Sequence, residues 1–289
     1  MAPFCGLPSP TEPLMHRCAP FLFFATFALS VQVAAADGAA QPEASPSKSA
    51  PQPWCAPEFE TLPGDVCYGP VASEPGQARS LVIFLHGLVQ QGAGWQHNQM
   101  RGMARSGKRL GFSVLAPRGK LGGSQRHGAN MVAWPTGRGA QQSHEDALLA
   151  DWTAAQKLIE KRQGAPFDEV FVVGFSNGAY YGSSLALRGR LEVDGYALFA
   201  GGSPRQPQVT GDKRAPIFVG VSGRDDTAKL ALELGRLLRK HRWPHRQETR
   251  PVGHLIADRH LDHALAYLRK QRTGAKKATS TAPQEPSKR

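Results

Sequence analysis

The sequence is poor in cysteine and acidic residues, and its N-terminal apolar block is shorter than a typical membrane-spanning helix. Four of its 289 residues are cysteines, and 35 Lys and Arg outnumber 23 Asp and Glu, giving a formal net charge of +12. The apolar block Phe21–Val33 is shorter than the roughly 20 residues that a membrane-spanning helix needs. We therefore expect no stable membrane anchor in the mature protein.

The excess of basic residues is not accompanied by a pattern for nucleic-acid binding. No recognition helix, zinc finger or basic strand with interleaved aromatic residues is evident. Much of the excess lies at 269–289, which holds seven Lys or Arg, one Glu and almost no apolar residue. Such segments are usually solvated. We predict a basic disordered tail at 271–289 and expect no nucleic-acid partner.

The first 36 residues have the composition of a secretory signal peptide. Arg17 precedes the apolar block, which ends in Ala34-Ala35-Ala36, an A-x-A pattern that favours cleavage after Ala36. Since the apolar block lies far from Met1, Met15 is an alternative start. A secreted or periplasmic location is predicted, and an uncleaved membrane anchor is the other interpretation.

The cysteines agree with export. Cys5 and Cys18 fall in the segment to be removed, which leaves Cys55 and Cys67 as the pair in the mature chain. An even pair in an oxidising compartment most simply forms one disulfide. This bond would hold an N-terminal segment whose proline-rich sequence favours little secondary structure.

The remaining chain divides into a linker and one compact domain. Residues 37–53 are rich in Ala, Pro, Ser and Gln and predict a disordered linker, whereas 54–270 alternates apolar runs with helical patterns. Strands are predicted at 66–71, 81–85, 112–116, 170–173, 195–199, 217–221 and 247–252, and helices at 98–109, 143–163, 179–187, 228–241 and 257–270. This alternation indicates an α/β domain, with a doubly wound, mostly parallel sheet covered by helices on both faces.

The most informative motif is Gly174-Phe175-Ser176-Asn177-Gly178, which directly follows the apolar run 170–173. A strand that turns sharply into a helix exposes a serine in a strained backbone conformation, and neighbouring glycines leave room for that turn. The pattern predicts Ser176 as a catalytic nucleophile. The alternative is an ordinary strand-to-helix turn.

Two downstream motifs supply a candidate acid and a candidate base. Gly223-Arg224-Asp225-Asp226 follows a predicted strand, and we prefer Asp226 as the acid, with Asp225 as the alternative. His254 follows the last predicted strand and is the expected base. His260 and His263 lie on one predicted helix without a third ligand at suitable spacing, so no metal site is expected.

An oxyanion hole needs two backbone N–H donors. Asn177, the residue after the nucleophile, is one expected donor because it opens a helix. Leu88 is the other, because it lies in the loop after the strand 81–85, in the run His86-Gly87-Leu88. His86 itself is expected to be structural.

The four motifs Phe84–Leu88, Gly174–Gly178, Gly223–Asp226 and Gly253-His254 together resemble the α/β-hydrolase superfamily. The resemblance covers about 80–270. Within the superfamily, the chain is similar to the phospholipase/carboxylesterase group and to secreted polyhydroxyalkanoate depolymerase and feruloyl-esterase-like proteins. The resemblance implies a serine esterase that works without metal or organic cofactor, and it leaves the substrate open.

The segment 200–216 between two predicted strands is too short for a large cap domain, so an open site is expected. Such a site would accept an ester in a small molecule or on a polymer. The long loop 119–139 carries Trp134, which is predicted either to wall the substrate site or to pack beneath the loop. Two other functions stay open: a peptidase or amidase, and a non-catalytic binding module.

Overall fold

A computed structural model of the chain describes residues 52–72, 76–123, 128–204 and 207–280. These residues all belong to one compact unit, Ser49–Arg289. The predicted signal peptide, most of the predicted linker and the last residues of the tail lie outside the described residues.

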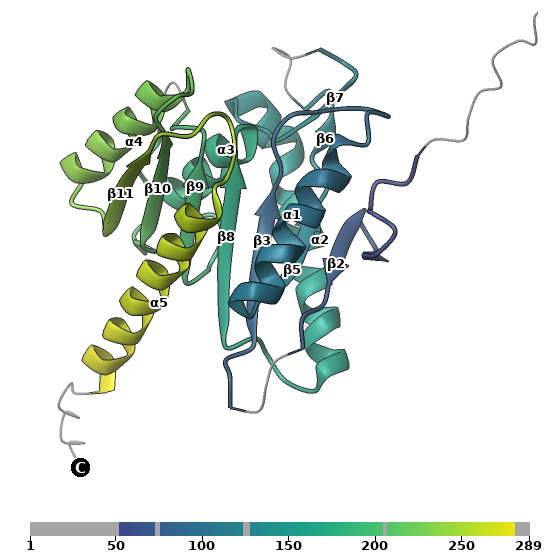
Figure 1. Cartoon of the computed structure of the whole chain (residues 1–289), viewed down its shortest axis with the longest axis horizontal. Coiled ribbons are helices and arrows are strands. Elements are labelled where there is room, and N and C mark those ends of the chain that lie inside the picture. The colour runs from purple at the N-terminus through teal and green to yellow at the C-terminus, as the bar shows by residue number, and fades with distance from the viewer. Residues whose placement is uncertain (1–51, 73–75, 124–127, 205–206, 281–289) are drawn as a thin grey trace, which may run out of the picture. The chain divides into compact units, whose positions relative to one another are not determined.

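The described domain is built on an eight-stranded sheet (Figure 1). Its strands, in spatial order, are β1 (Glu60–Leu62), β2 (Val66–Gly69), β5 (Ser113–Pro117), β3 (Ser80–Leu85), β8 (Glu169–Phe175), β9 (Gly195–Phe199), β10 (Ile217–Ser222) and β11 (His245–Arg250). Only the pairings β1–β2 and β2–β5 are antiparallel. The mostly parallel sheet predicted from the sequence is confirmed.

Both faces of the sheet are buried, which explains why its central strands are mostly apolar. In β3, Leu81, Ile83 and Leu85 enter one core cluster, while Val82 and Phe84 enter the other. This alternation follows from the two-residue period of a strand.

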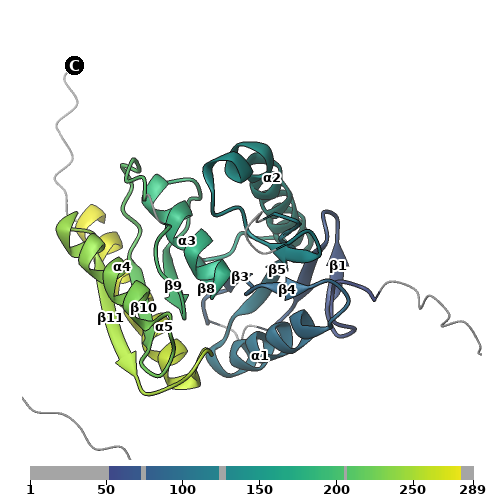
Figure 2. The ribbon, with the colours of Figure 1, turned by 90° about the horizontal axis from the view of Figure 1, so that it is seen from above.

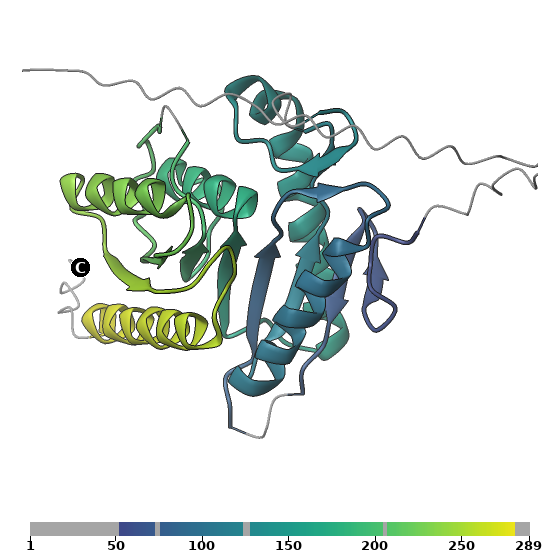
Figure 3. The same ribbon diagram turned by 45° about the horizontal axis from the view of Figure 1, so that its top comes forward.

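Five helices cover the sheet among the described residues: α1 (Trp95–Leu110), α2 (Arg138–Gln163), α3 (Asn177–Arg188), α4 (Ala228–Lys240) and α5 (Asp258–Ser280). Side chains of α1 and α5 pack in one cluster, and those of α2, α3 and α4 pack in the other. Figure 2 shows α1 on the opposite side of the sheet from α2 and α3, and Figure 3 shows β11 between α4 and α5. None of these helices is long and apolar enough to cross a membrane.

The C-terminal helix extends into the segment that was predicted to be a disordered tail. α5 continues to Ser280 instead of ending at 270. Residues 271–280 are poor in apolar side chains but include Ala, Lys, Arg and Gln, which favour helix. Arg272 Nε also forms an ion pair with Asp194 Oδ1 at 2.9 Å, which ties this part of the helix to the domain.

The region predicted as the loop 119–139 holds regular structure instead. β6 (Lys120–Leu121) and β7 (Met131–Ala133) pair with each other, and β7 pairs with β4 (Val89–Gln90), forming a small antiparallel sheet. α2 begins at Arg138, earlier than its predicted start at Ser143.

The disulfide between Cys55 and Cys67 is present, with an S–S distance of 2.08 Å. It joins the N-terminal segment to β2, a strand next to β5 in the main sheet. Between β9 and β10, the described residues 200–204 and 207–216 contain no helix, so no cap domain is formed there.

Candidate active site

The turn from β8 into α3 holds Ser176 in a strained conformation. Its φ of 52° and ψ of −117° are unusual for a residue with a side chain. The glycines on either side are required by close contact: a Cβ at Gly178 would lie 2.0 Å from the carbonyl oxygen of Leu85, and one at Gly174 would lie 2.6 Å from that of Gly178. The sharp turn predicted from the glycine spacing is therefore present.

Ser176 and His254 are joined by a hydrogen bond, although they lie far apart in the sequence. His254 Nε2 lies 2.9 Å from Ser176 Oγ. The other ring nitrogen, Nδ1, lies 2.7 Å from Asp225 Oδ2. Serine, imidazole and carboxylate thus form one continuous chain of hydrogen bonds, the arrangement that activates a serine hydroxyl.

The carboxylate in this chain is Asp225, which corrects the sequence-based preference for Asp226. A tight turn, in which the Asp225 amide donates to Ser222 O at 3.1 Å, directs the first of the two aspartates toward His254. Asp226 is exposed to solvent. The side chain of Asp225 is only 7% exposed.

Asp225 is held in its ionised form. Burial alone would raise the pKa of its carboxyl group, but hydrogen bonds from the amide of Thr227, from His254 and from the Thr227 hydroxyl outweigh burial and keep the pKa below its usual range. A charged Asp225 favours the His254 tautomer with the proton on Nδ1, which leaves Nε2 free to accept the serine proton.

The two expected oxyanion donors border the serine. Asn177 is the first residue of α3, so its N–H has no partner within the helix. Leu88 lies between β3 and β4, in a loop that packs against the serine, since a Cβ at Gly87 would lie 3.3 Å from Ser176 Cβ.

The peptide bond between His86 and Gly87, just before Leu88, is held by two hydrogen bonds. Gly87 N donates to Gln99 Oε1 at 2.9 Å, and Trp134 Nε1 donates to His86 O at 2.7 Å. Neither Gln99 nor the indole nitrogen of Trp134 was recognised from the sequence, because these contacts link segments distant along the chain.

His86 is buried and forms a hydrogen bond within the fold, as expected for a structural residue. Its Nε2 accepts a hydrogen bond from Gly119 N at 3.0 Å, so the ring proton is on Nδ1. Burial lowers the pKa of this imidazole to about 4, which keeps it neutral.

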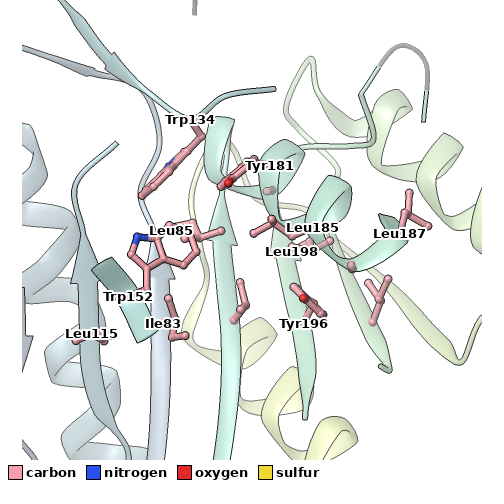
Figure 4. Close-up of a cluster of buried hydrophobic side chains, with 14 of the residues drawn as sticks. Ile83, Leu85, Leu115, Trp134, Trp152, Tyr181, Leu185, Leu187, Tyr196 and Leu198 are labelled. Carbon is pink, nitrogen blue, oxygen red and sulfur yellow. The ribbon is translucent and has the colours of Figure 1, made fainter. Parts of the chain in front are cut away.

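Trp134 does not form an open aromatic wall, which corrects that interpretation. Its side chain is 0% exposed and stacks on Tyr181, with ring centroids 5.7 Å apart, while Trp152 meets it edge-on (Figure 4). Its backbone N–H donates to Asn177 Oδ1 at 2.7 Å. Trp134 thus contacts both segments that carry the expected oxyanion donors.

A cavity of about 510 Å³ adjoins His254. One wall is α1, from Trp95 to Arg109, and the other is the chain from His254 into the start of α5. Apolar side chains form much of its lining, namely Phe84, Met103, Phe175, Ile256 and Leu261. The sequence did not predict that α1 would line the site.

No group of three or more His, Cys, Asp or Glu suited to a metal ion occurs within the described part of the chain. His263, considered above as a weak ligand candidate, has its Nδ1 2.9 Å from Glu248 Oε2. His260 is buried, and its Nε2 lies 3.1 Å from the carbonyl oxygen of Glu248.

The model of one known family matches residues 68–269, which is more than half of the chain and includes the serine, both aspartates and the histidine. The chain belongs to the phospholipase/carboxylesterase family. Members of this family are α/β hydrolases, and the sheet and helices described above agree with that fold.

Solved structures that are similar to this chain include two carboxylesterases. The Bacillus cereus carboxylesterase is 17% identical with a TM-score of 0.48, and the match covers 74% of this chain and 94% of that one. The carboxylesterase from Mesorhizobium loti is 21% identical with a TM-score of 0.46, covering 76% and 99%. SOBER1 from Arabidopsis thaliana is 18% identical with a TM-score of 0.47, covering 68% and 100%. No curated protein matches the chain.

Proposed function

We propose that this family member is a serine hydrolase that cleaves carboxylic esters through an acyl-enzyme, with Ser176 as nucleophile, His254 as base and Asp225 as the orienting acid. The observation that carries the proposal is the unbroken chain of hydrogen bonds from Ser176 through His254 to Asp225, starting at a strained strand-to-helix turn. Family membership supports ester chemistry.

The reaction follows from this geometry. Ser176 Oγ attacks the ester carbonyl while His254 Nε2 takes its proton, and the charge on the carbonyl oxygen is stabilised by the N–H groups of Leu88 and Asn177. His254 then protonates the departing alcohol, which leaves an acyl group on Ser176. A water molecule, deprotonated by His254, attacks the acyl carbonyl and releases the acid, and the serine regains its proton.

We also propose that the protein is exported after cleavage following Ala36. The apolar N-terminal segment supports a signal peptide, and the pairing of Cys55 with Cys67 is typical of an oxidising compartment. The mass of protein collected outside the cytoplasm tests this: an N-terminus at Asp37 is expected, and retention of the full N-terminal segment would contradict it.

Ester turnover tests the catalytic assignment. Wild-type protein is expected to hydrolyse para-nitrophenyl esters, and Ser176→Ala to lose that activity while its Tm stays close to that of wild type. Equal activity in the two proteins would exclude Ser176 as the nucleophile. Matched para-nitroanilides, run alongside, separate an esterase from an amidase.

A further inference from the structure

The cavity beside His254 is lined by both apolar and polar side chains. The apolar ones include Trp95, which is 52% exposed, and Leu255, which is 46% exposed. The polar lining comes largely from α1, including Asn98, Gln99 and Arg105. An apolar group attached to a polar or charged end would match both parts.

Three arginines follow one another at four-residue spacing on α1, and two of them are neutralised. Arg101 Nε lies 2.5 Å from Glu58 Oε1. Arg109 pairs with Asp262 and, at 3.5 Å, with Asp258.

Arg105, between them, has no hydrogen-bond or ion-pair partner within the described part of the chain. Its guanidinium lies beside Gly102, another residue of the cavity lining: a Cβ placed on Gly102 would lie 3.8 Å from Arg105 Nη2. The side chain therefore runs back along the helix toward the active site, the usual direction for helical side chains.

No carboxylate among the described residues pairs with the positive charge of Arg105. Arg105 is exposed, so an anion that enters from solvent can reach its guanidinium. The cavity contains one acidic side chain, Asp258, and it pairs with Arg109. A guanidinium matches the two oxygens of a carboxylate or a phosphate.

We propose that Arg105 binds an anionic group of the substrate, so that the preferred esters carry a carboxylate or phosphate separated from the scissile carbonyl by an apolar segment. This inference rests on the proposed esterase function. The spacing follows from α1: Gln99 contacts the loop of the expected oxyanion donor, and Gly102 and Arg105 lie roughly 5 and 9 Å farther along the helix axis.

Matched substrates test the proposal. Mono-para-nitrophenyl adipate carries a free carboxylate, and its methyl ester is neutral with the same chain. A lysophosphatidic acid, compared with the monoacylglycerol of the same acyl chain, tests phosphate on the alcohol side. We expect kcat/KM to be about tenfold higher for the anionic member of at least one pair, as a charge-assisted hydrogen bond to arginine would give. The preference should fall as salt is added.

Arg105→Gln is expected to remove the preference, because kcat/KM for the anionic ester falls to that of its neutral partner. Arg101→Gln is the control, because it removes an equal charge from the same helix at a position that does not line the cavity. Equal kcat/KM within both pairs, or a preference that survives Arg105→Gln, would overturn the proposal while leaving the esterase function intact.

Binding separates this inference from the esterase proposal. Monomethyl adipate and glycerol phosphate, titrated calorimetrically into Ser176→Ala protein, are compared with the same titrations into Ser176→Ala/Arg105→Gln. Binding of either anion that depends on Arg105 supports the site even if no ester is hydrolysed. Absence of binding for both anions, together with equal turnover of the pairs, contradicts it.

Discussion

At the scale of single residues, the peptide bond between His86 and Gly87 is held at both of its polar ends. Trp134 Nε1 donates to the carbonyl oxygen, and Gln99 Oε1 accepts from the N–H. The next N–H along the chain belongs to Leu88, an expected oxyanion donor. A donor that is fixed before the reaction costs no reorganisation when charge develops.

Replacing Trp134 by Phe removes the indole donor but keeps an aromatic ring against Tyr181. We expect kcat to fall about tenfold or more with little change in KM, because a misplaced oxyanion donor weakens transition-state binding specifically. Steady-state kinetics measures this split. Trp152→Phe is the matched control, since its indole nitrogen is buried and has no hydrogen-bond partner among the described residues. Its kcat should stay near the wild-type value. Equal losses in both variants would contradict the role of the Trp134 donor.

The two neighbouring aspartates give a second prediction. Asp225→Asn is expected to lower kcat by about 10³- to 10⁴-fold, because an amide favours the wrong imidazole tautomer. Asp226→Asn should stay within about twofold of wild type, since Asp226 is exposed. Kinetics of the two variants, measured side by side, decide between them, and a larger loss in Asp226→Asn would reverse the assignment.

Motif spacing predicts some residues of the site but not others. The meeting of Ser176 and His254 could be predicted because each follows a strand in an ordered set of motifs. The choice between Asp225 and Asp226 depends on one turn, in which Asp225 N donates to Ser222 O, and adjacent identical residues give no indication of it. The burial of Trp134 depends on tertiary stacking against Tyr181, which local sequence does not encode.

At the scale of elements, α2 begins at Arg138, earlier than its predicted start at 143, so Glu145 lies inside the helix. Glu145 is buried and accepts hydrogen bonds from Arg188 and Arg190. These arginines lie on and just after α3, so the contact that stabilises this part of α2 is distant in sequence.

Glu145 is expected to make stability depend on pH. Burial alone would raise its pKa, but the hydrogen bonds and charges of Arg188 and Arg190 outweigh burial and lower it. A lowered folded-state pKa means that its contribution is fully present above the unfolded value of about 4.3 and is lost as pH falls through the folded value.

Glu145→Gln should therefore destabilise the protein by about 3 kcal/mol at pH near 7, because Arg188 loses a buried partner. Denaturant unfolding at a series of pH values measures the difference, which should shrink below about pH 4 as wild-type Glu145 is protonated. A difference that stays constant while pH falls through that range would show that the ion pair does not contribute.

At the scale of the whole molecule, the sheet and its two helical layers could be predicted because apolar strands alternate with helical patterns throughout 81–270. The short strands β4, β6 and β7 could not, because two- or three-residue strands carry no periodicity and depend on pairing with each other. α5 extended past the predicted end because helix propensity and the Arg272–Asp194 pair act where apolar patterning is absent.

The disulfide acts on the stability of the whole domain. Cys55 and Cys67 enclose a short loop, with a sequence separation of 12, so the bond restricts the unfolded chain. Replacing both cysteines by Ser is expected to reduce the free energy of unfolding by about 2–3 kcal/mol. Thermal unfolding with and without reductant provides the comparison: reductant should lower the Tm of wild type and leave the double variant unchanged. Equal responses in the two proteins would contradict this contribution.

The central claim is that Ser176 is an activated nucleophile in this phospholipase/carboxylesterase family member. Its most direct test is the intact mass of the folded protein after incubation with a fluorophosphonate, which reacts with activated serines. We predict one phosphonyl adduct on wild type and none on Ser176→Ala. Folded wild-type protein that gains no adduct, or a Ser176→Ala variant that gains the same adduct, would contradict the account.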